Sequence, residues 1–263
     1  MGGVAEITIP RFILMYVLLL IVLTIMKRYR MKQSRQILFA SLRMTVQLVL
    51  AGFVLTYIFK NPHPVFTMAY VACMIGFTIH RITSKNPQLN KKFRAAIASS
   101  VTLAGLAIIC FFVGIVVHHD IFDPQYLIPM SGMIFGNIMT GVNLGVKSLY
   151  DALSSEKLRI ETLLNIGGTP QMILQPYVER SLETAIIPTV NSMVGMGIVS
   201  LPGMMTGQIL AGSLPITATM YQIAAMICIS TTVCLSVFGS LHFGYQTLYN
   251  RRNQIHIEAD GNE

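Results

Sequence analysis

The sequence has few charged residues and no tryptophan. Asp, Glu, Lys and Arg together make up 11% of its 263 residues, whereas soluble globular domains contain about 25%. Hydrophobic residues make up 53%. This balance excludes an ordinary soluble domain and places the chain among membrane proteins.

The signatures of catalysis and of tightly bound metal are also missing. The cysteines are few, lie in apolar stretches and show no CxxC spacing, so neither a disulfide nor a zinc site is predicted; they are Cys73, Cys110, Cys228 and Cys234. No HExxH motif or Ser/His/Asp set occurs, and the stretch from Gly141 to Ser148 lacks the spacing of a phosphate-binding loop. We therefore predict a protein that is not an enzyme and that binds no cofactor of its own.

Long apolar runs dominate what is present. A membrane helix needs roughly 20 mostly apolar residues, and the sequence predicts an all-α polytopic protein with about seven such spans. The predicted spans are Ile9–Met26, Arg43–Phe59, Val65–Ile79, Ala95–Val117, Tyr126–Val146, an interrupted Ala185–Gly212, and Pro215–Phe243. We expect one transmembrane domain over residues 1–250 and a polar cytoplasmic tail over residues 251–263.

The joints between the spans indicate the orientation. Basic residues gather in Lys27–Arg35, His80–Arg94 and Lys147–Arg180, and they are absent from His118–Asp123. The positive-inside rule predicts that the N-terminus lies outside and the C-terminus inside. We also expect a multi-pass protein of the plasma (inner) membrane. The net charge of +8 is then explained by basic residues that fix the orientation of the chain in the lipid bilayer. Nucleic acid is not a predicted partner. Residues 27–39 fit either an interfacial elbow or a solvated loop equally well.

Residues 150–170 form the longest polar interruption and predict a short cytoplasmic helix. Ser154 or Ser155 is the expected N-cap, and Gly167-Gly168 with Pro170 supplies the stop. The apolar side of this helix is expected to comprise Leu158, Leu163, Leu164 and Ile166. One interpretation is a coupling helix that docks into a groove on a soluble partner; the other is an ordinary amphipathic connector.

The interrupted sixth span is the candidate transport path. Pro188 and Pro202-Gly203 are both expected to break the helical hydrogen-bond ladder, and irregular backbone at membrane depth is tolerated where it lines a cavity. The candidate residues of this path are Asn137, Pro188, Asn191, Ser192, Met193, Pro202, Gly203 and Met204. The alternative is a kinked structural helix followed by an outer turn.

Asn137 belongs to the fifth span, which is studded with glycines. Small residues four apart let helices approach closely, so packing is the expected role of Gly132, Gly136, Gly141 and Gly145. The amide of Asn137 needs a hydrogen-bond partner if it lies in the hydrocarbon layer. It either faces the substrate route or bonds to a neighbouring helix. Asp and Glu are confined to the joints, and the lack of buried acid pairs disfavours a proton-coupled carrier.

One candidate metal site lies at the outer mouth, beyond the fourth span. His118, His119, Asp120 and Asp123 gather there, and imidazole with carboxylate suits a borderline divalent ion such as Fe²⁺. A solvated loop is the competing interpretation. The 17 methionines are common packing residues, although Met133, Met193, Met196, Met204 and Met205 lie near the predicted path.

Two motifs carry a family resemblance. Ser131-Gly132-Met133…Gly136-Asn137 and the run from Pro188 to Gly207, which contains Ser200-Leu201-Pro202-Gly203-Met204-Met205, resemble the bacterial iron-export ABC permeases of the FetB type and the related plant aluminium-tolerance permeases. The resemblance also includes the turn Gly167-Gly168-Thr169-Pro170 and covers nearly the whole chain except its two ends.

The resemblance implies a permease that pairs with a separate ABC ATPase, which holds the ATP and Mg²⁺, and that exports iron, protecting the cell against iron overload and oxidative stress. It also implies a homodimer, and it favours the coupling-helix interpretation, with Leu158, Glu161, Leu164, Gly167 and Gly168 at the ATPase contact. Two alternatives remain. One is an ABC permease that moves an organic solute such as a nucleotide sugar, and the other is an ATP-independent secondary carrier.

Overall fold

The computed structural model describes residues 8–29 and 34–250, and within these ranges its regular elements are helices, with no β-strand. The predicted all-α class is therefore confirmed. The predicted tail, residues 251–263, lies outside the described residues.

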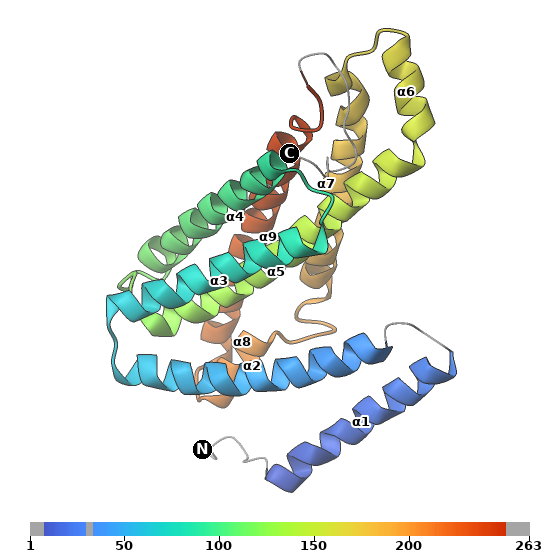
Figure 1. Cartoon of the computed structure of the whole chain (residues 1–263). Coiled ribbons are helices and arrows are strands. Elements are labelled where there is room, and N and C mark those ends of the chain that lie inside the picture. The colour runs from blue at the N-terminus through green and yellow to red at the C-terminus, as the bar shows by residue number, and fades with distance from the viewer. Residues whose placement is uncertain (1–7, 30–33, 251–263) are drawn as a thin grey trace.

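Nine α-helices follow one another along the described part of the chain (Figure 1). Their bounds are α1 Ile9–Arg28, α2 Ser34–Lys60, α3 Pro64–Lys85, α4 Lys91–Phe111, α5 Pro124–Ser155, α6 Lys157–Asn165, α7 Pro170–Gly195, α8 Gly203–Leu210 and α9 Pro215–Tyr245, and a π-helical turn, η1 Phe112–Val116, continues α4. Proline opens α3, α5, α7 and α9, where its missing N–H is not needed.

Six of these helices are long and apolar enough to cross a membrane: α1, α2, α3, α4 with η1, α5 and α9. Each contains one of the predicted spans. The predicted spans are shorter than the helices at their polar ends, because α2 already begins at Ser34 and α5 continues to Ser155. Ile37, Leu38 and Phe39 therefore belong to a helix, not to a loop.

The interrupted sixth span is organised differently from the prediction. Its first part belongs to α7, which begins at Pro170 and runs unbroken through Pro188 to Gly195. The predicted break at Pro188 is therefore wrong, because the loss of a single N–H is absorbed within a long packed helix. The break falls later, at residues 196–202, where Gly197 takes a φ of +85°.

The core lies where α9 packs along α4 and α5, while α3 and α7 pack against α5 on either side (Figure 1). Glycines permit the closest approaches. A Cβ atom at Gly141 would lie 2.8 Å from Val233 Cγ1 of α9, and one at Gly145 would lie 3.2 Å from Leu241 Cδ1. The expected packing role is confirmed for these two glycines, whereas a Cβ at Gly136 would meet no other part of the described structure within 4 Å.

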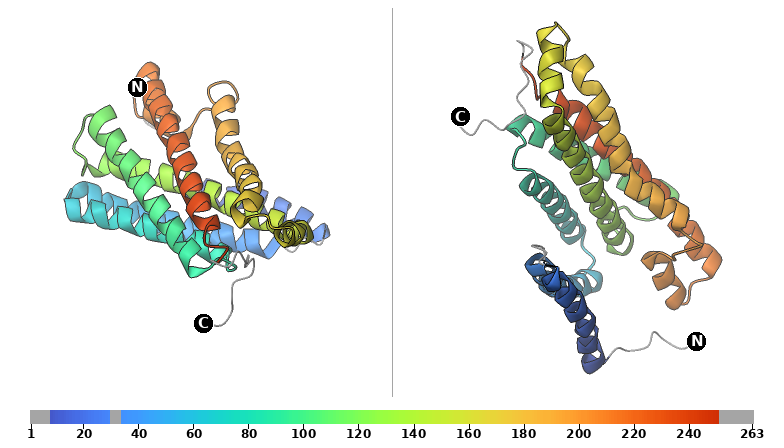
Figure 2. Two further views of the ribbon diagram at one scale, coloured as in Figure 1. Left: turned by 90° about the horizontal axis from the view of Figure 1, so that it is seen from above. Right: turned by 90° about the vertical axis from the view of Figure 1, so that its right-hand side faces the viewer.

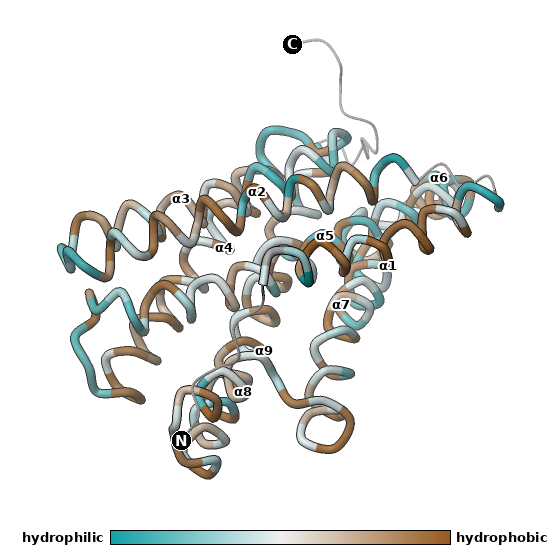
Figure 3. Tube along the Cα trace, turned by 90° about the horizontal axis from the view of Figure 1, so that it is seen from below, coloured by the Kyte–Doolittle hydropathy of each residue, from teal (hydrophilic) through white to brown (hydrophobic). Residues whose placement is uncertain are grey.

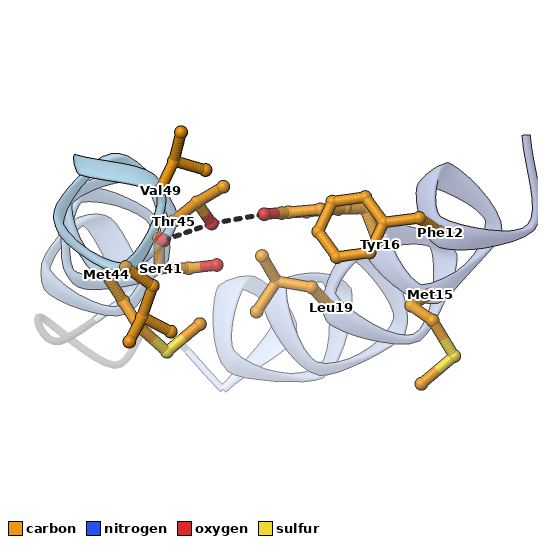
Figure 4. Close-up of a pocket in the computed structure, with 9 residues that line it drawn as sticks. Phe12, Met15, Tyr16, Leu19, Ser41, Met44, Thr45 and Val49 are labelled. Atoms are coloured by element: carbon orange, nitrogen blue, oxygen red, sulfur yellow. Dashed lines mark hydrogen bonds between the residues drawn. The ribbon is translucent and has the colours of Figure 1, made fainter. Parts of the chain in front are cut away.

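Helices α1 and α2 form a pair at one edge of the bundle (Figure 2). Their apolar side chains are exposed on nearly every side, as expected for helices that face lipid. A pocket of about 450 Å³ lies between them (Figure 4). Tyr16 of α1 and Thr45 of α2 share a hydrogen bond across it, so the pair is joined by polar as well as apolar contacts.

Hydrophilic residues gather at the helix ends and joints (Figure 3). One end of the bundle, here called the α6 end, carries α6, the α3–α4 joint 86–90 and residues 246–250. The other end, here called the α8 end, carries residues 117–123 and α8. At the α6 end, Asn90 Nδ2 donates to the Thr247 carbonyl at 3.0 Å. Nearby, burial raises the pKa of the Tyr249 phenol, and the neighbouring Tyr245 adds to the shift.

Candidate functional site

Helix α6 and the turn that follows it form a projecting unit at one end of the bundle (Figure 1). The helix ends in a Schellman motif, in which the Gly168 N–H donates to the Leu163 carbonyl at 2.9 Å and the Gly167 N–H to the Leu164 carbonyl at 3.0 Å. Gly167 has a φ of +94°, a conformation that favours glycine. The predicted glycine stop is therefore confirmed.

The start of α6 differs from the prediction. Neither Ser154 nor Ser155 caps it, because α5 continues through both residues and Ser155 Oγ donates back to the Ala152 carbonyl at 3.0 Å. The residue before α6 is Glu156, whose side chain makes no capping hydrogen bond. It accepts instead from Arg159 Nη1 at 3.4 Å, in an exposed pair. The two helices are thus joined directly, with one residue between them.

The apolar residues of α6 divide into two sets. Ile160 is buried, and Leu163 and Leu164 pack against the core. Leu158 and Ile166 instead face outward with exposed fractions of 78% and 76%. The predicted single apolar side is wrong in this respect, because Ile160 anchors α6 to the bundle and leaves the other two free.

The outward-facing side of this unit continues into α7. Met172, in the first turn of α7, is 74% exposed, and Glu161 and Gly167 are exposed between the apolar side chains. We call Leu158, Glu161, Ile166, Gly167 and Met172 the α6 surface. Of the predicted coupling residues, Leu158, Glu161 and Gly167 lie on it, whereas Leu164 and Gly168 face the bundle in part.

A groove of about 580 Å³ lies between α5 and α7, and Glu156, the residue before α6, also lines it. Charges of both signs line it, including Lys147, Asp151 and Arg180. The groove gives the α6 end of the molecule a charged recess.

The predicted path residues lie on exposed faces of α5 and α7. Asn137 is exposed, and its amide donates to the Met133 carbonyl one turn earlier at 2.8 Å. Asn191, Ser192 and Met193 are exposed near the end of α7, and Ser192 Oγ donates to the Pro188 carbonyl at 2.9 Å. Asn137 and Ser192 each donate a hydrogen bond within their own helix, and both residues still face outward.

The remaining path residues surround the break after α7. Pro202 is the N-cap of α8 and Gly203 its first residue, while Met204 is half-buried and packs against the core. The path assigned to these residues stays a prediction.

Sequence reasoning missed a polar contact between α3 and α5. Asn86, at the C-cap of α3, is buried and donates from Nδ2 to Asn143 Oδ1 of α5 at 3.0 Å. A cleft of about 370 Å³ lies here, lined also by Lys85 and Lys147. The only sequence signals were an asparagine in the polar joint 80–94 and another in the apolar fifth span. Nothing in the sequence paired residues so far apart.

The candidate outer residues come together only in part. His119 Nδ1 lies 3.1 Å from Asp123 Oδ2, while Asp123 Oδ1 caps α5 by accepting from the Gln125 N–H at 2.9 Å. Asp120 accepts from the Phe122 N–H, and His118 has a φ of 55°. Within the described residues, no group of three or more His, Cys, Asp or Glu side chains could hold a metal ion. Of the four residues of the predicted outer metal site, His119 and Asp123 are brought into contact. Metal binding there stays a prediction.

These features define a multi-pass helical membrane protein with a projecting helix at one end. Residues 9–249 match the family described as "Uncharacterised protein family (UPF0014)". The chain belongs to this family.

Three relatives show how widely the family is spread. The "UPF0014 membrane protein slr1647" of Synechocystis is 33% identical over 84% of this chain and 85% of its own length. The "Probable iron export permease protein FetB" of Escherichia coli is 30% identical over 95% of each chain. "Protein ALUMINUM SENSITIVE 3" of Arabidopsis thaliana is 27% identical over 94% of this chain and 88% of its own. No solved structure matches.

Proposed function

We propose that this chain is the permease subunit of an ABC-type exporter that moves iron out of the cytoplasm across the inner membrane. A separate subunit would bind and hydrolyse the ATP with its Mg²⁺. The observation that carries the proposal is the α6 surface, in which Leu158, Ile166 and Met172 are each at least 74% exposed at a polar end of the molecule.

The chemistry of that surface suits a protein partner better than lipid. The charged groove lies at the same end of the molecule, and charged groups do not belong in the hydrocarbon layer. Large apolar side chains that project from a short helix can anchor it in a groove of a partner. Burying apolar area of this kind stabilises association, so a soluble ATPase that covers the α6 surface accounts for its exposure.

The connections of α6 offer a mechanical route for the energy. One residue separates α6 from α5, and the Gly167–Thr169 turn joins it to α7. A partner that displaces α6 therefore pulls on both helices. Because α5 carries Asn137 and α7 carries Asn191, the same displacement would move the two exposed amides relative to each other. This is the alternating-access step we propose.

Iron is favoured as cargo by the name of the Escherichia coli relative, a probable iron export permease that aligns over 95% of this chain. A nucleotide sugar or another organic solute is the alternative within the same architecture. An ATP-independent, proton-coupled carrier is disfavoured, because the buried polar residues in the described part of the chain are Thr, Ser, Asn and Gln, with no carboxylate among them.

Two permease copies with two ATPase subunits form the complete transporter in this proposal. The exposed face of α5 around Gly136 and Asn137 would then meet the second copy at a shared path. This arrangement leaves the lipid-facing pair α1 and α2 on the outside.

Transport in sealed vesicles tests the proposal. The permease and its ATPase, recognised by a Walker A motif and an ABC signature, are reconstituted together, and ATP-driven movement of Fe²⁺, Al³⁺ and UDP-glucose is compared. We expect Fe²⁺ to move. Movement of UDP-glucose alone would overturn the metal assignment, and movement without the ATPase would overturn the ABC assignment.

A further inference from the structure

Three segments meet at the α8 end: the connection 196–202, helix α8 and the first turns of α9. Two thioether sulfurs there contact polar groups of α9. Gln222 Nε2 lies 3.8 Å from Met196 Sδ, and Thr219 Oγ1 lies 4.0 Å from Met205 Sδ. Residues three apart on a helix share a face, so the two sulfurs lie over neighbouring positions of α9.

The Gln222 amide is only half satisfied. The residue is 5% exposed, and its Oε1 is buried with no hydrogen-bond partner among the described residues. Gln208 Oε1, three residues after Met205 on α8, is buried and unpartnered in the same way. A buried acceptor without a donor is costly. Rotation about the terminal side-chain torsion, which is soft, brings Gln222 Oε1 beside the Met196 sulfur.

The surroundings carry no charge. Between Glu183 and His242 the sequence contains no Asp, Glu, Lys, Arg or His, so the donors available at this end are thioethers, amides, hydroxyls and backbone carbonyls. A neutral donor set at membrane depth compensates a single positive charge far better than a double one, because the cost of desolvating an ion rises with its charge. Thioether sulfur is a soft ligand that selects Cu(I), whereas divalent iron is better served by imidazole and carboxylate.

We propose that Met196, Met205 and Gln222 form a binding site for a soft monovalent metal ion, Cu(I) or Ag(I). The two sulfurs supply the soft ligands, and the unpartnered amide oxygen completes the set. The ligands come from the connection after α7, from α8 and from α9, so a bound ion ties the non-helical connection to the bundle. The site goes beyond the proposed iron export and does not depend on the ATPase.

The test measures metal binding by the purified full chain in detergent, without any ATPase, under anaerobic reducing conditions. Ag(I) and Cu(I) are titrated in competition with a chromophoric chelator. The Met196→Leu, Met205→Leu and Gln222→Leu variants are compared with Met44→Leu and Met68→Leu, whose side chains are 52% and 54% exposed on α2 and α3. Leucine approximates the volume of methionine, so the thermal midpoint without metal serves as a folding check.

We expect each site variant to weaken binding at least tenfold and both control variants to leave it unchanged. The four cysteines are competing soft ligands. The series is therefore repeated in a chain in which all four are replaced by alanine. If that chain does not fold, the series in the wild-type background decides. Equal affinity in site and control variants would overturn the site. X-ray absorption of bound Ag(I) gives a second criterion, because absence of sulfur neighbours in the cysteine-free chain would also overturn it. Neither result bears on ATP-driven iron movement.

Discussion

Asn86 and Asn143 join α3 to α5 by a direct amide–amide hydrogen bond of 3.0 Å, while the same Asn86 nitrogen also donates to the Ile82 carbonyl at 2.8 Å. Asn143 in turn donates to the Met139 carbonyl at 2.7 Å. A chain of bonds therefore runs from one helix to the other along the cleft that Lys85 and Lys147 also line.

Replacing Asn143 by leucine should loosen this contact. Interhelical hydrogen bonds in membrane proteins contribute about 0.6 kcal/mol on average and up to ~1.7 kcal/mol, so we expect a small fall in the free energy of unfolding, measured by thermal denaturation in detergent. Asn61→Leu is the control, because Asn61 is exposed and bonds only within its own helix end. An identical effect of the two replacements would mean that the pair contributes nothing specific.

Gly244→Ala should disturb the packing of α9 on α4. A Cβ at this position would overlap with the Phe93 ring, and Phe93 is fully buried, so the ring has no free space to move into. We expect a loss of about 1–3 kcal/mol, as for other overpacked cores. Gly136→Ala, with no atom within 4 Å of the new Cβ, should be neutral or slightly stabilising. A normal unfolding midpoint for Gly244→Ala would contradict the close approach.

Asp123 allows charge and capping to be separated. Asp123→Asn keeps an oxygen that can accept from the Gln125 N–H, whereas Asp123→Ala removes it, so the alanine variant should lose about 1 kcal/mol and the asparagine variant much less. The same pair tests the outer metal prediction. If His119 and Asp123 bind Fe²⁺, Asp123→Asn weakens Fe²⁺ binding without a matching loss of stability. Unaltered Fe²⁺ binding by Asp123→Asn, and unaltered efflux by a His118→Ala/His119→Ala double variant, would remove the site.

Gly167 should be intolerant of a side chain for conformational reasons. Its Cβ position is open, with no atom within 4 Å, yet its φ of +94° disfavours any other residue. Gly167→Val should therefore distort the turn and abolish co-purification with the ATPase while membrane insertion remains normal. Gly203→Val at the opposite end, with open space and an ordinary φ, is the control for size alone. Normal co-purification of Gly167→Val would count against the docking site.

How far the sequence predicts the structure depends on whether a feature is local. The Gly167-Gly168 stop was predictable because a helix end is set by neighbouring residues, and the apolar spans were predictable from composition alone. The end of α5 was not, since Ser154 and Ser155 have the composition of a cap but lie in a helix held by the buried Leu153. Pro188 misled for the same reason: packing of α7 against α5 and α9 outweighs one lost hydrogen bond.

The candidate site shows the same limit. The sequence indicated that Leu158 and Ile166 are apolar residues of α6, but not that Ile160 would be the buried anchor, because a nine-residue helix can turn either face to the bundle. The Asn86–Asn143 bond and the contacts of Met196 and Met205 with α9 are tertiary. They depend on helix placement, which no local pattern encodes.

The most direct test of the central claim is Fe²⁺ movement by permease and ATPase together in sealed vesicles, compared for the wild type, Ile166→Asp and Asn165→Asp. Ile166 and Asn165 are adjacent and both exposed, so each variant adds one carboxylate to an exposed position at the end of α6, but only Ile166→Asp places it among the proposed apolar anchors. The account predicts ATP-dependent Fe²⁺ movement for the wild type and Asn165→Asp, and little for Ile166→Asp despite normal insertion. Fe²⁺ accumulation by the permease alone, without nucleotide, would contradict it.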